Sequence, residues 1–146
     1  MTNQTIGLLI GGLMPAVFYG ISGVFAKPAT EAGIGIGLYI LLIGLAVSLT
    51  GLLIYGFSPD NTISMRSGIF TVAVGLTWAI GAAGVAVALA SYQVPVSRLV
   101  PLYNMNTLVA VLLGLVIFSE WKDVQTAKLV GGAVLIAIGG SMVATS

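Results

Sequence analysis

The sequence of 146 residues contains no cysteine and no histidine, and charged residues make up only 6% of it. The absence of cysteine excludes disulfides and thiol chemistry, and the absence of histidine removes imidazole catalysis and the commonest zinc ligand. Five Lys and Arg against four Asp and Glu form no basic surface for nucleic acid and no acidic tail. We therefore expect no metal site, no cofactor and no nucleic-acid partner.

Apolar residues, by contrast, are abundant. They make up 58% of the chain, so a soluble fold would lack enough polar side chains to cover its surface. Glycine accounts for 20 residues, about twice its usual share, and in membrane proteins glycine lets helices approach closely. The composition predicts an all-α integral membrane protein in contact with membrane lipid, a multi-pass protein that we place in the cell inner (plasma) membrane.

Five apolar stretches follow one another along the chain. They predict transmembrane helices over residues 5–26, 33–57, 68–91, 99–118 and 127–144. We expect Lys27 and Pro28 to end the first helix and Arg66 to precede the third. Polar clusters at 58–61 and 122–128 predict loops. Because all connections are short, the prediction is a single membrane domain over residues 1–146.

The fourth stretch is the one around which the others are organised. From Leu99 to Phe118 it has twenty residues without a charge, enough to cross about 30 Å of hydrocarbon. Arg98 and Glu120 fall at its two ends, and Trp121 is placed as an interfacial anchor. Two asparagines inside such a helix are costly unless they face other protein or a wet cavity.

No motif for bond-making chemistry is visible, and all charged residues fall at or near helix ends, so we predict no catalytic residue and no enzyme. Uncharged polar and aromatic residues inside the helices suit binding instead. The cavity candidates are Tyr19, Ser22, Trp78, Tyr103, Asn104, Asn106 and Thr107. The candidate helix kinks are Pro15 and Pro101.

Each candidate has an ordinary structural alternative. Asn104 and Asn106 point about 200° apart on a helix, so one can line a cavity while the other bonds a neighbouring helix. Trp78 can face lipid, and Tyr103 can be an interfacial tyrosine. Pro15 can be a kink without a functional role, although it lies one turn before Tyr19 and would free a carbonyl there.

Several of these residues carry a resemblance to a known family. Pro95, Ser97, Pro101, Gly114 and Glu120, followed by the pairs Gly131-Gly132 and Gly139-Gly140, resemble the last part of an EamA-type repeat. The segment from Phe18 to Lys27 is similar to the opening helix of that repeat. EamA-type repeats build the drug/metabolite transporter superfamily, whose usual member has two inverted five-helix repeats around a central cavity. This chain would supply one half of such a ten-helix inverted-repeat fold.

The resemblance implies secondary transport of small organic solutes by alternating access. Small multidrug resistance proteins, relatives with four helices, use a carboxylate in their first helix, whereas the first helix here has Tyr19 and Ser22. A small neutral, zwitterionic or amphiphilic metabolite is therefore the expected substrate. The alternatives are an accessory or structural membrane subunit and a flippase for a lipid-linked sugar.

A chain that supplies only one five-helix repeat of a ten-helix fold needs a partner that supplies the other. Five spans put the two termini on opposite sides, so an inverted pair requires one copy to insert upside down. Lys and Arg in short loops set the orientation, and they number three on the N-terminal side and two on the other. This weak bias predicts a dual-topology protein that forms an antiparallel homodimer. The alternative is a heterodimer with an oppositely oriented half.

Overall fold

The computed structural model describes residues 3–59, 62–122 and 124–146. Asp60, Asn61 and Asp123, which belong to the two predicted polar loops, lie outside the described residues. The described part consists of helices and the short connections between them, and it contains no strand. Five helices are long and apolar enough to cross a membrane, which confirms the prediction of an all-α, multi-pass membrane protein. The five spans are Thr5–Glu31, Ile36–Phe57, Met65–Ala90, Val96–Ile117 and Thr126–Ala144.

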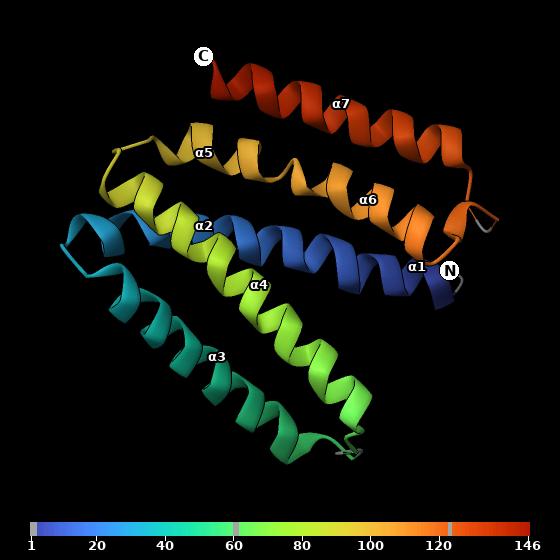
Figure 1. The fold of residues 1–146 in the computed structure, drawn as a ribbon, viewed down its shortest axis with the longest axis horizontal. Helices are drawn as coiled ribbons and strands as arrows, with labels where there is room; N and C mark the ends of the chain where they lie inside the picture. Colours follow the sequence, from blue (N-terminus) through green and yellow to red (C-terminus); the bar gives the residue numbers. More distant parts are fainter. Residues whose placement is uncertain (1–2, 60–61, 123) are drawn as a thin grey trace. The chain divides into compact units, whose positions relative to one another are not determined.

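Two of the five spans are interrupted. The first consists of α1 (Asn3–Leu8), a π-helical segment η1 (Leu9–Leu13) and α2 (Met14–Glu31). The fourth consists of α5 (Val96–Tyr103) and α6 (Asn106–Ile117). The others are the single helices α3 (Ile36–Phe57), α4 (Met65–Ala90) and α7 (Thr126–Ala144), and a short 3₁₀ turn η2 (Glu120–Lys122) precedes α7 (Figure 1).

The contacts divide the chain into two compact units. The first unit is Met1–Gly23 with Val94–Ser146, and the second is Val24–Gln93. A division by contacts does not define domains that fold separately, so one membrane domain over residues 1–146 stays a prediction. In the first unit α7 packs along both α5 and α6, and in the second α3 packs against α4 (Figure 1).

The expected end of the first helix was wrong. The helix continues through Lys27 and Pro28 to Glu31, because proline fits a helical φ and removes only one hydrogen bond. The Thr30 hydroxyl donates to the carbonyls of Ala26 and Lys27, at 3.0 and 2.9 Å, and supports the last turn. The helix ends where Gly33 adopts a left-handed φ of +84°, a conformation that glycine adopts without strain.

Two other helix starts also differ from the prediction. Helix α4 begins at Met65 because Ser64 and Ser67 form a reciprocal capping box, so Arg66 lies inside the first turn and does not precede the helix. Helix α5 begins at Val96, directly after the extended Pro95, so Arg98 is also in a first turn. Both basic side chains therefore extend from helix ends, as expected near a water interface.

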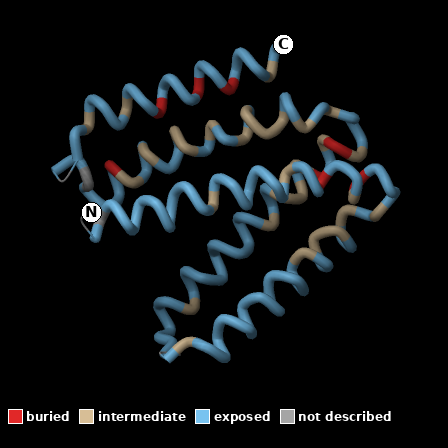
Figure 2. Tube along the Cα trace, turned by 180° about the vertical axis from the view of Figure 1, so that it is seen from behind, coloured by how far each residue is buried: buried red, intermediate tan, exposed pale blue. Residues whose placement is uncertain are grey.

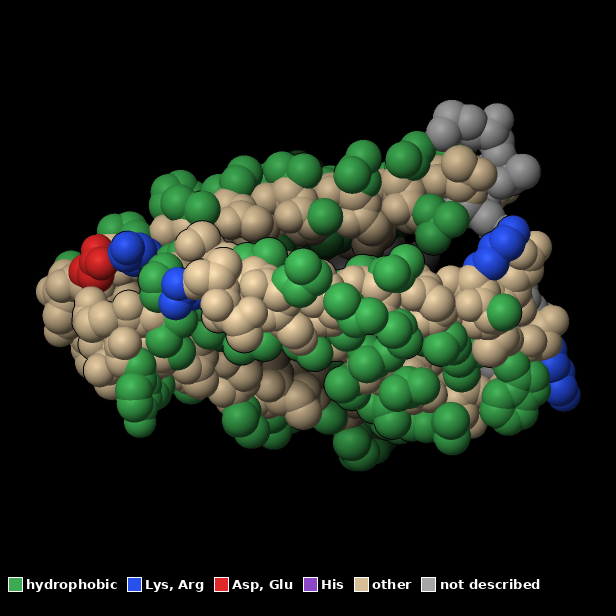
Figure 3. Space-filling model, turned by 90° about the horizontal axis from the view of Figure 1, so that it is seen from above, with side chains coloured by type: hydrophobic (Ala, Val, Ile, Leu, Met, Phe, Trp, Pro, Cys, Tyr) green, Lys and Arg blue, Asp and Glu red, His purple; other side chains and the backbone are tan. Residues whose placement is uncertain are grey.

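Few of the residues that the structure describes are buried within the chain. In the first unit they are Leu115, Ala133, Ala137 and Gly140, and in the second Ala26, Thr30, Ala86 and Leu89 (Figure 2). Most large apolar side chains are exposed and cover the middle of the helices, while Lys, Arg and Glu lie toward the helix ends (Figure 3). Such a surface suits lipid or another membrane protein as its surroundings.

Candidate functional site

The fourth span is broken at Asn104 and Met105. The amide of Met105 would bond the Pro101 carbonyl in a continuous helix, but it donates to the Leu102 carbonyl at 3.1 Å. The amides of Thr107 and Leu108 likewise donate to carbonyls three residues back, at 3.1 and 2.9 Å. The backbone thus tightens into successive short turns between α5 and α6. The break comes three residues after Pro101, whose ring cannot donate a hydrogen bond.

This break lies deep in the span. Asn104 follows Val96 by eight residues, about 12 Å along a helix whose 22 residues extend over roughly 33 Å. Irregular backbone at such a depth is tolerated only where protein covers it or where it lines a water-filled cavity. The break therefore marks a place that lipid alone cannot cover.

Polar side chains gather at the break. Asn104 and Asn106 are exposed in the single chain, whereas Tyr103 and Thr107 are half-buried. A carboxamide offers two donors and an acceptor, so the pair of asparagines can hydrogen-bond an uncharged or zwitterionic solute from either side of the turn. The site is a recognition surface without a charged group of its own.

Two glycines let neighbouring helices approach α5. At Gly23 of α2, an added Cβ would lie 3.2 Å from Val100 Cγ2 and 3.3 Å from Tyr103 Oη. At Gly140 of α7, an added Cβ would lie 2.6 Å from the Pro101 carbonyl oxygen. Helix α5 thus packs along α7 and touches α2 locally at Gly23, close to where its regular hydrogen bonding ends.

The first span contributes a second irregular segment. In η1 the amide of Met14 donates to the Leu9 carbonyl five residues back, a π-type bond that lies directly before Pro15. Single π-helical turns occur frequently at functional sites. One turn after Pro15, Tyr19 is 69% exposed, and the Ser22 hydroxyl donates to its carbonyl at 2.9 Å. That hydroxyl remains able to accept a hydrogen bond from a ligand.

Among the predicted site residues, the structure brings Tyr103 of α5 to Gly23 of α2, one residue beyond Ser22. Asn104, Asn106 and Thr107 lie at or beside the break that follows Tyr103. Trp78 belongs to the second unit, where it lies on α4 with 52% of its surface exposed.

Sequence reasoning missed Met105, which is part of the break, and Gly140 and Ser141 of α7, which lie beside it. The Ser141 hydroxyl lies 3.8 Å from Met105 Sδ, and Gly140 faces Pro101. In the sequence, Gly139-Gly140 stood out only as part of the resemblance to an EamA-type repeat, which does not say which of the two glycines is in contact.

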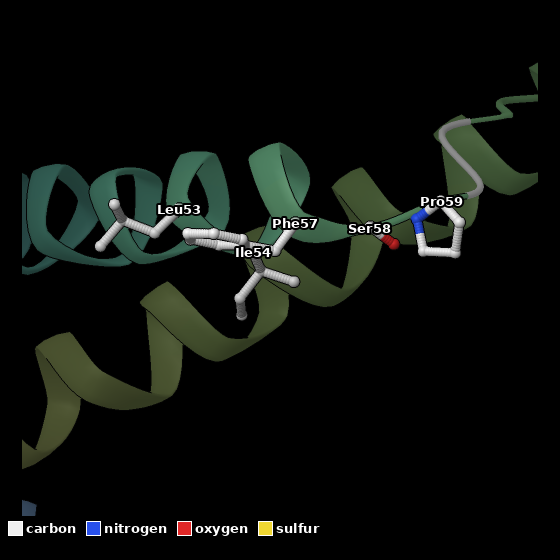
Figure 4. Close-up of a pocket in the computed structure, with 5 residues that line it drawn as sticks. All are labelled: Leu53, Ile54, Phe57, Ser58 and Pro59. Atoms are coloured by element: carbon white, nitrogen blue, oxygen red, sulfur yellow. The ribbon is translucent and has the colours of Figure 1, made fainter.

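A separate apolar hollow lies at the end of α3 in the second unit. It is an open depression of about 420 Å³ lined by Leu53, Ile54, Phe57, Ser58 and Pro59 (Figure 4). Its lining is apolar except for Ser58, so it lacks the converging polar groups expected of a specific binding site. The break in the fourth span is the better candidate.

The chemistry at the break is that of binding. In the part of the chain that the structure describes, no three His, Cys, Asp or Glu residues come together to hold a metal ion. No protein-family model, curated protein or solved structure matches the chain. The likeness to an EamA-type repeat therefore rests on the sequence residues that carry it.

Proposed function

We propose that the protein is a secondary transporter that moves a small neutral, zwitterionic or amphiphilic metabolite across the cell inner membrane by alternating access. The observation that carries this proposal is the break at Asn104 and Met105, with exposed carboxamides about 12 Å into a membrane span. Discontinuous helices at this depth are the usual way in which transporters build a substrate site.

The alternating-access part of the proposal draws on the interrupted first span. Its π-helical segment Leu9–Leu13 and the α5–α6 break belong to the same unit. Two spans with irregular backbone in one compact unit give that unit places where helices bend, and bending or rocking of helices around a fixed site is the usual basis of alternating access. A simple structural subunit would have no need of either interruption.

We further propose that the working form is an antiparallel homodimer of EamA-type halves. The break and its asparagines are exposed in one chain, so a second half is the natural cover for them. Arg66, Lys122 and Lys128 lie at the ends of spans on the N-terminal side, and Lys27 and Arg98 lie on the other. A difference of one basic residue is a weak orientation signal, which allows both insertions.

Tracer flux into liposomes that contain only this protein tests the transport proposal. A panel of neutral, zwitterionic and amphiphilic solutes should include at least one whose entry saturates and is inhibited by its own unlabelled form. Absence of flux for every solute, with the protein folded and dimeric, would favour an accessory or structural subunit. Movement of a lipid-linked sugar alone would favour a flippase.

Single-cysteine variants test the topology, and the chain has no native cysteine to interfere. We expect Asn3→Cys and Thr145→Cys each to be labelled in part by a membrane-impermeant thiol reagent in intact cells. Full labelling of one position and full protection of the other would contradict dual topology and favour a heterodimer with a separate half.

Added charge then tests the dimer. Thr62→Lys with Ile63→Lys, on the connection between α3 and α4, changes the balance to five against two and so strongly favours one orientation. We expect this variant alone to lose flux. The control, Ala32→Lys with Ile63→Lys, adds one Lys to each side and should keep it.

A further inference from the structure

Helix α7 comes very close to the backbone of α5 at Gly140, beside the break in the fourth span. Gly140 is buried, and an added Cβ there would lie 2.6 Å from the Pro101 carbonyl oxygen and 3.4 Å from Met105 Cγ. The first contact is closer than real Cβ atoms come to a carbonyl oxygen, and that oxygen is part of the backbone and cannot rotate away. Gly139, one residue earlier, has nothing within 4 Å of its position.

The Pro101 carbonyl is one of the groups that the break frees from regular helix bonding. In a continuous helix it would point along the axis to the amide of Met105, but that amide bonds Leu102. The absence of a side chain at Gly140 leaves room for the carbonyl where it now lies. Beside it, the Ser141 hydroxyl lies 3.8 Å from Met105 Sδ, so α7 contacts one residue before the break, Pro101, and one residue within it, Met105.

We propose that Gly140 is a positioning residue: it allows the Pro101 carbonyl to leave the helix and so holds the break open at Asn104. The role of Gly140 in transport rests on the proposed function, whereas its role in shaping the break does not. Helix α7 then acts through backbone contact on the site, although it supplies none of the site's polar side chains.

A matched pair of substitutions separates this role from a general effect of alanine. Gly140→Ala and Gly139→Ala make the same chemical change on adjacent residues of one helix and gain the same helix propensity. Only the first meets a backbone atom. Overpacking of this kind typically shifts an equilibrium by roughly fivefold to a hundredfold. We expect only Gly140→Ala to weaken the packing of α7 against the break.

The packing can be measured without transport. Cysteines introduced as Met105→Cys and Ser141→Cys should be joined by a short bifunctional thiol reagent, and the bridged protein is counted by its mass. The double variant and its Gly139→Ala derivative should cross-link to the same extent, and the Gly140→Ala derivative should cross-link about tenfold less. Failure of the double variant itself to cross-link would overturn the contact between α7 and the break.

Pro101→Ala provides a rescue. Alanine restores the missing amide and favours a continuous helix. The carbonyl of residue 101 then returns toward the helix axis and moves away from residue 140. In the Gly140→Ala background it should recover cross-linking and, if that variant fails to fold, recover folded protein. Equal behaviour of the two alanine variants, or no recovery with Pro101→Ala, would overturn the proposal.

Flux is measured on the variants without introduced cysteines. It distinguishes a role of Gly140 in transport from a role in shaping the break alone. Loss of flux in Gly140→Ala but not in Gly139→Ala supports a positioning role in transport. If even the unsubstituted protein shows no flux for any solute, the proposed function fails, and cross-linking alone decides whether Gly140 holds the break.

Discussion

The two compact units of the chain treat polar groups within the membrane in opposite ways. In the second unit α3 and α4 run without interruption for 22 and 26 residues. The hydroxyls of Thr50 and Thr71 donate to carbonyls four residues back in their own helices, at 3.0 and 2.8 Å. These helices satisfy their own hydrogen bonds, so lipid is a sufficient environment for them.

The first unit contains the interruptions of both spans, at Leu9–Leu13 and at Asn104 and Met105, and exposed carboxamides beside the second of them. A carboxamide at mid-depth cannot be satisfied by its own helix in the same way and needs protein or water. A binding site is therefore expected in the first unit, whose backbone and side chains need a polar environment. It is not expected in the second unit, whose helices satisfy their own hydrogen bonds.

Removing the carboxamides of Asn104 and Asn106 should have the largest effect, because they are the polar groups that distinguish the first unit from the second. Asn104→Leu and Asn106→Leu keep the side-chain volume and delete the hydrogen bonds, so we expect at least one of them to abolish tracer flux while the protein stays folded. Flux in liposomes and elution as a single species from detergent are the two measurements.

Thr50→Val in the second unit is the matched control for these variants. It removes a hydroxyl that bonds only its own helix, so flux should persist. Unchanged transport in both asparagine variants would remove the break as the substrate site. Loss of folding in them would instead indicate a structural hydrogen bond between helices, which is worth about 0.6 to 2 kcal/mol.

The number of spans could be predicted from the sequence because it depends on long apolar runs separated by polar residues. The helix ends were less predictable because local bonds decide them. Pro28 was expected to end the first helix, yet the Thr30 hydroxyl supports the last turn and Gly33 provides the actual stop. A capping box at Ser64 likewise starts α4 before the charged residue that was expected to precede it.

The candidate site could be located to one segment, since asparagines inside an apolar run are unusual. The exact position of the break could not be predicted, because Pro101 alone permits either a bent continuous helix or two separate helices. The contact at Gly140 was beyond sequence reasoning, because adjacent glycines differ only in which direction the folded helix turns them.

Closing the break should have the next largest effect. Pro101→Ala restores a backbone amide, and proline inside a helix costs up to about 3 kcal/mol, so the variant should unfold at a higher temperature. A free-energy change of this size strongly favours a continuous fourth span over a broken one. We therefore expect flux to fall by roughly tenfold. Thermal unfolding in detergent and liposome flux check the two halves of this prediction.

Pro28→Ala is its control in the second unit, in the last turn of α2. It also restores an amide inside a helix, but at the membrane surface, where no substrate site is proposed. Flux should stay at the level of the unsubstituted protein. Equal losses in the two proline variants would mean that helix continuity in general, and not this break, governs transport.

A smaller effect is expected where α2 contacts α5. Gly23→Ala would place a methyl group 3.2 Å from Val100 Cγ2 and 3.3 Å from Tyr103 Oη, both of which belong to side chains that can shift. Overpacking against movable atoms lies at the low end of its usual range, about 1 kcal/mol, so flux should fall by roughly fivefold. Gly20→Ala, which meets nothing within 4 Å, should leave flux unchanged. A stronger loss at Gly20 than at Gly23 would contradict this arrangement.

The smallest effect is expected at the ion pair that ends α2 in the second unit. Lys27 Nζ lies 3.7 Å from Glu31 Oε1, one helical turn away, and both side chains are 49% exposed. Such a pair contributes about 0.3 to 0.5 kcal/mol, and salt screens it. Glu31→Gln should therefore lower the unfolding temperature only slightly, and the difference should disappear at high salt. Because this carboxylate lies outside the unit that contains the break, the substitution should leave both flux and its dependence on pH unchanged. A displaced pH profile would show that a charged group of the second unit takes part in transport, and the contrast between the two units would then no longer hold.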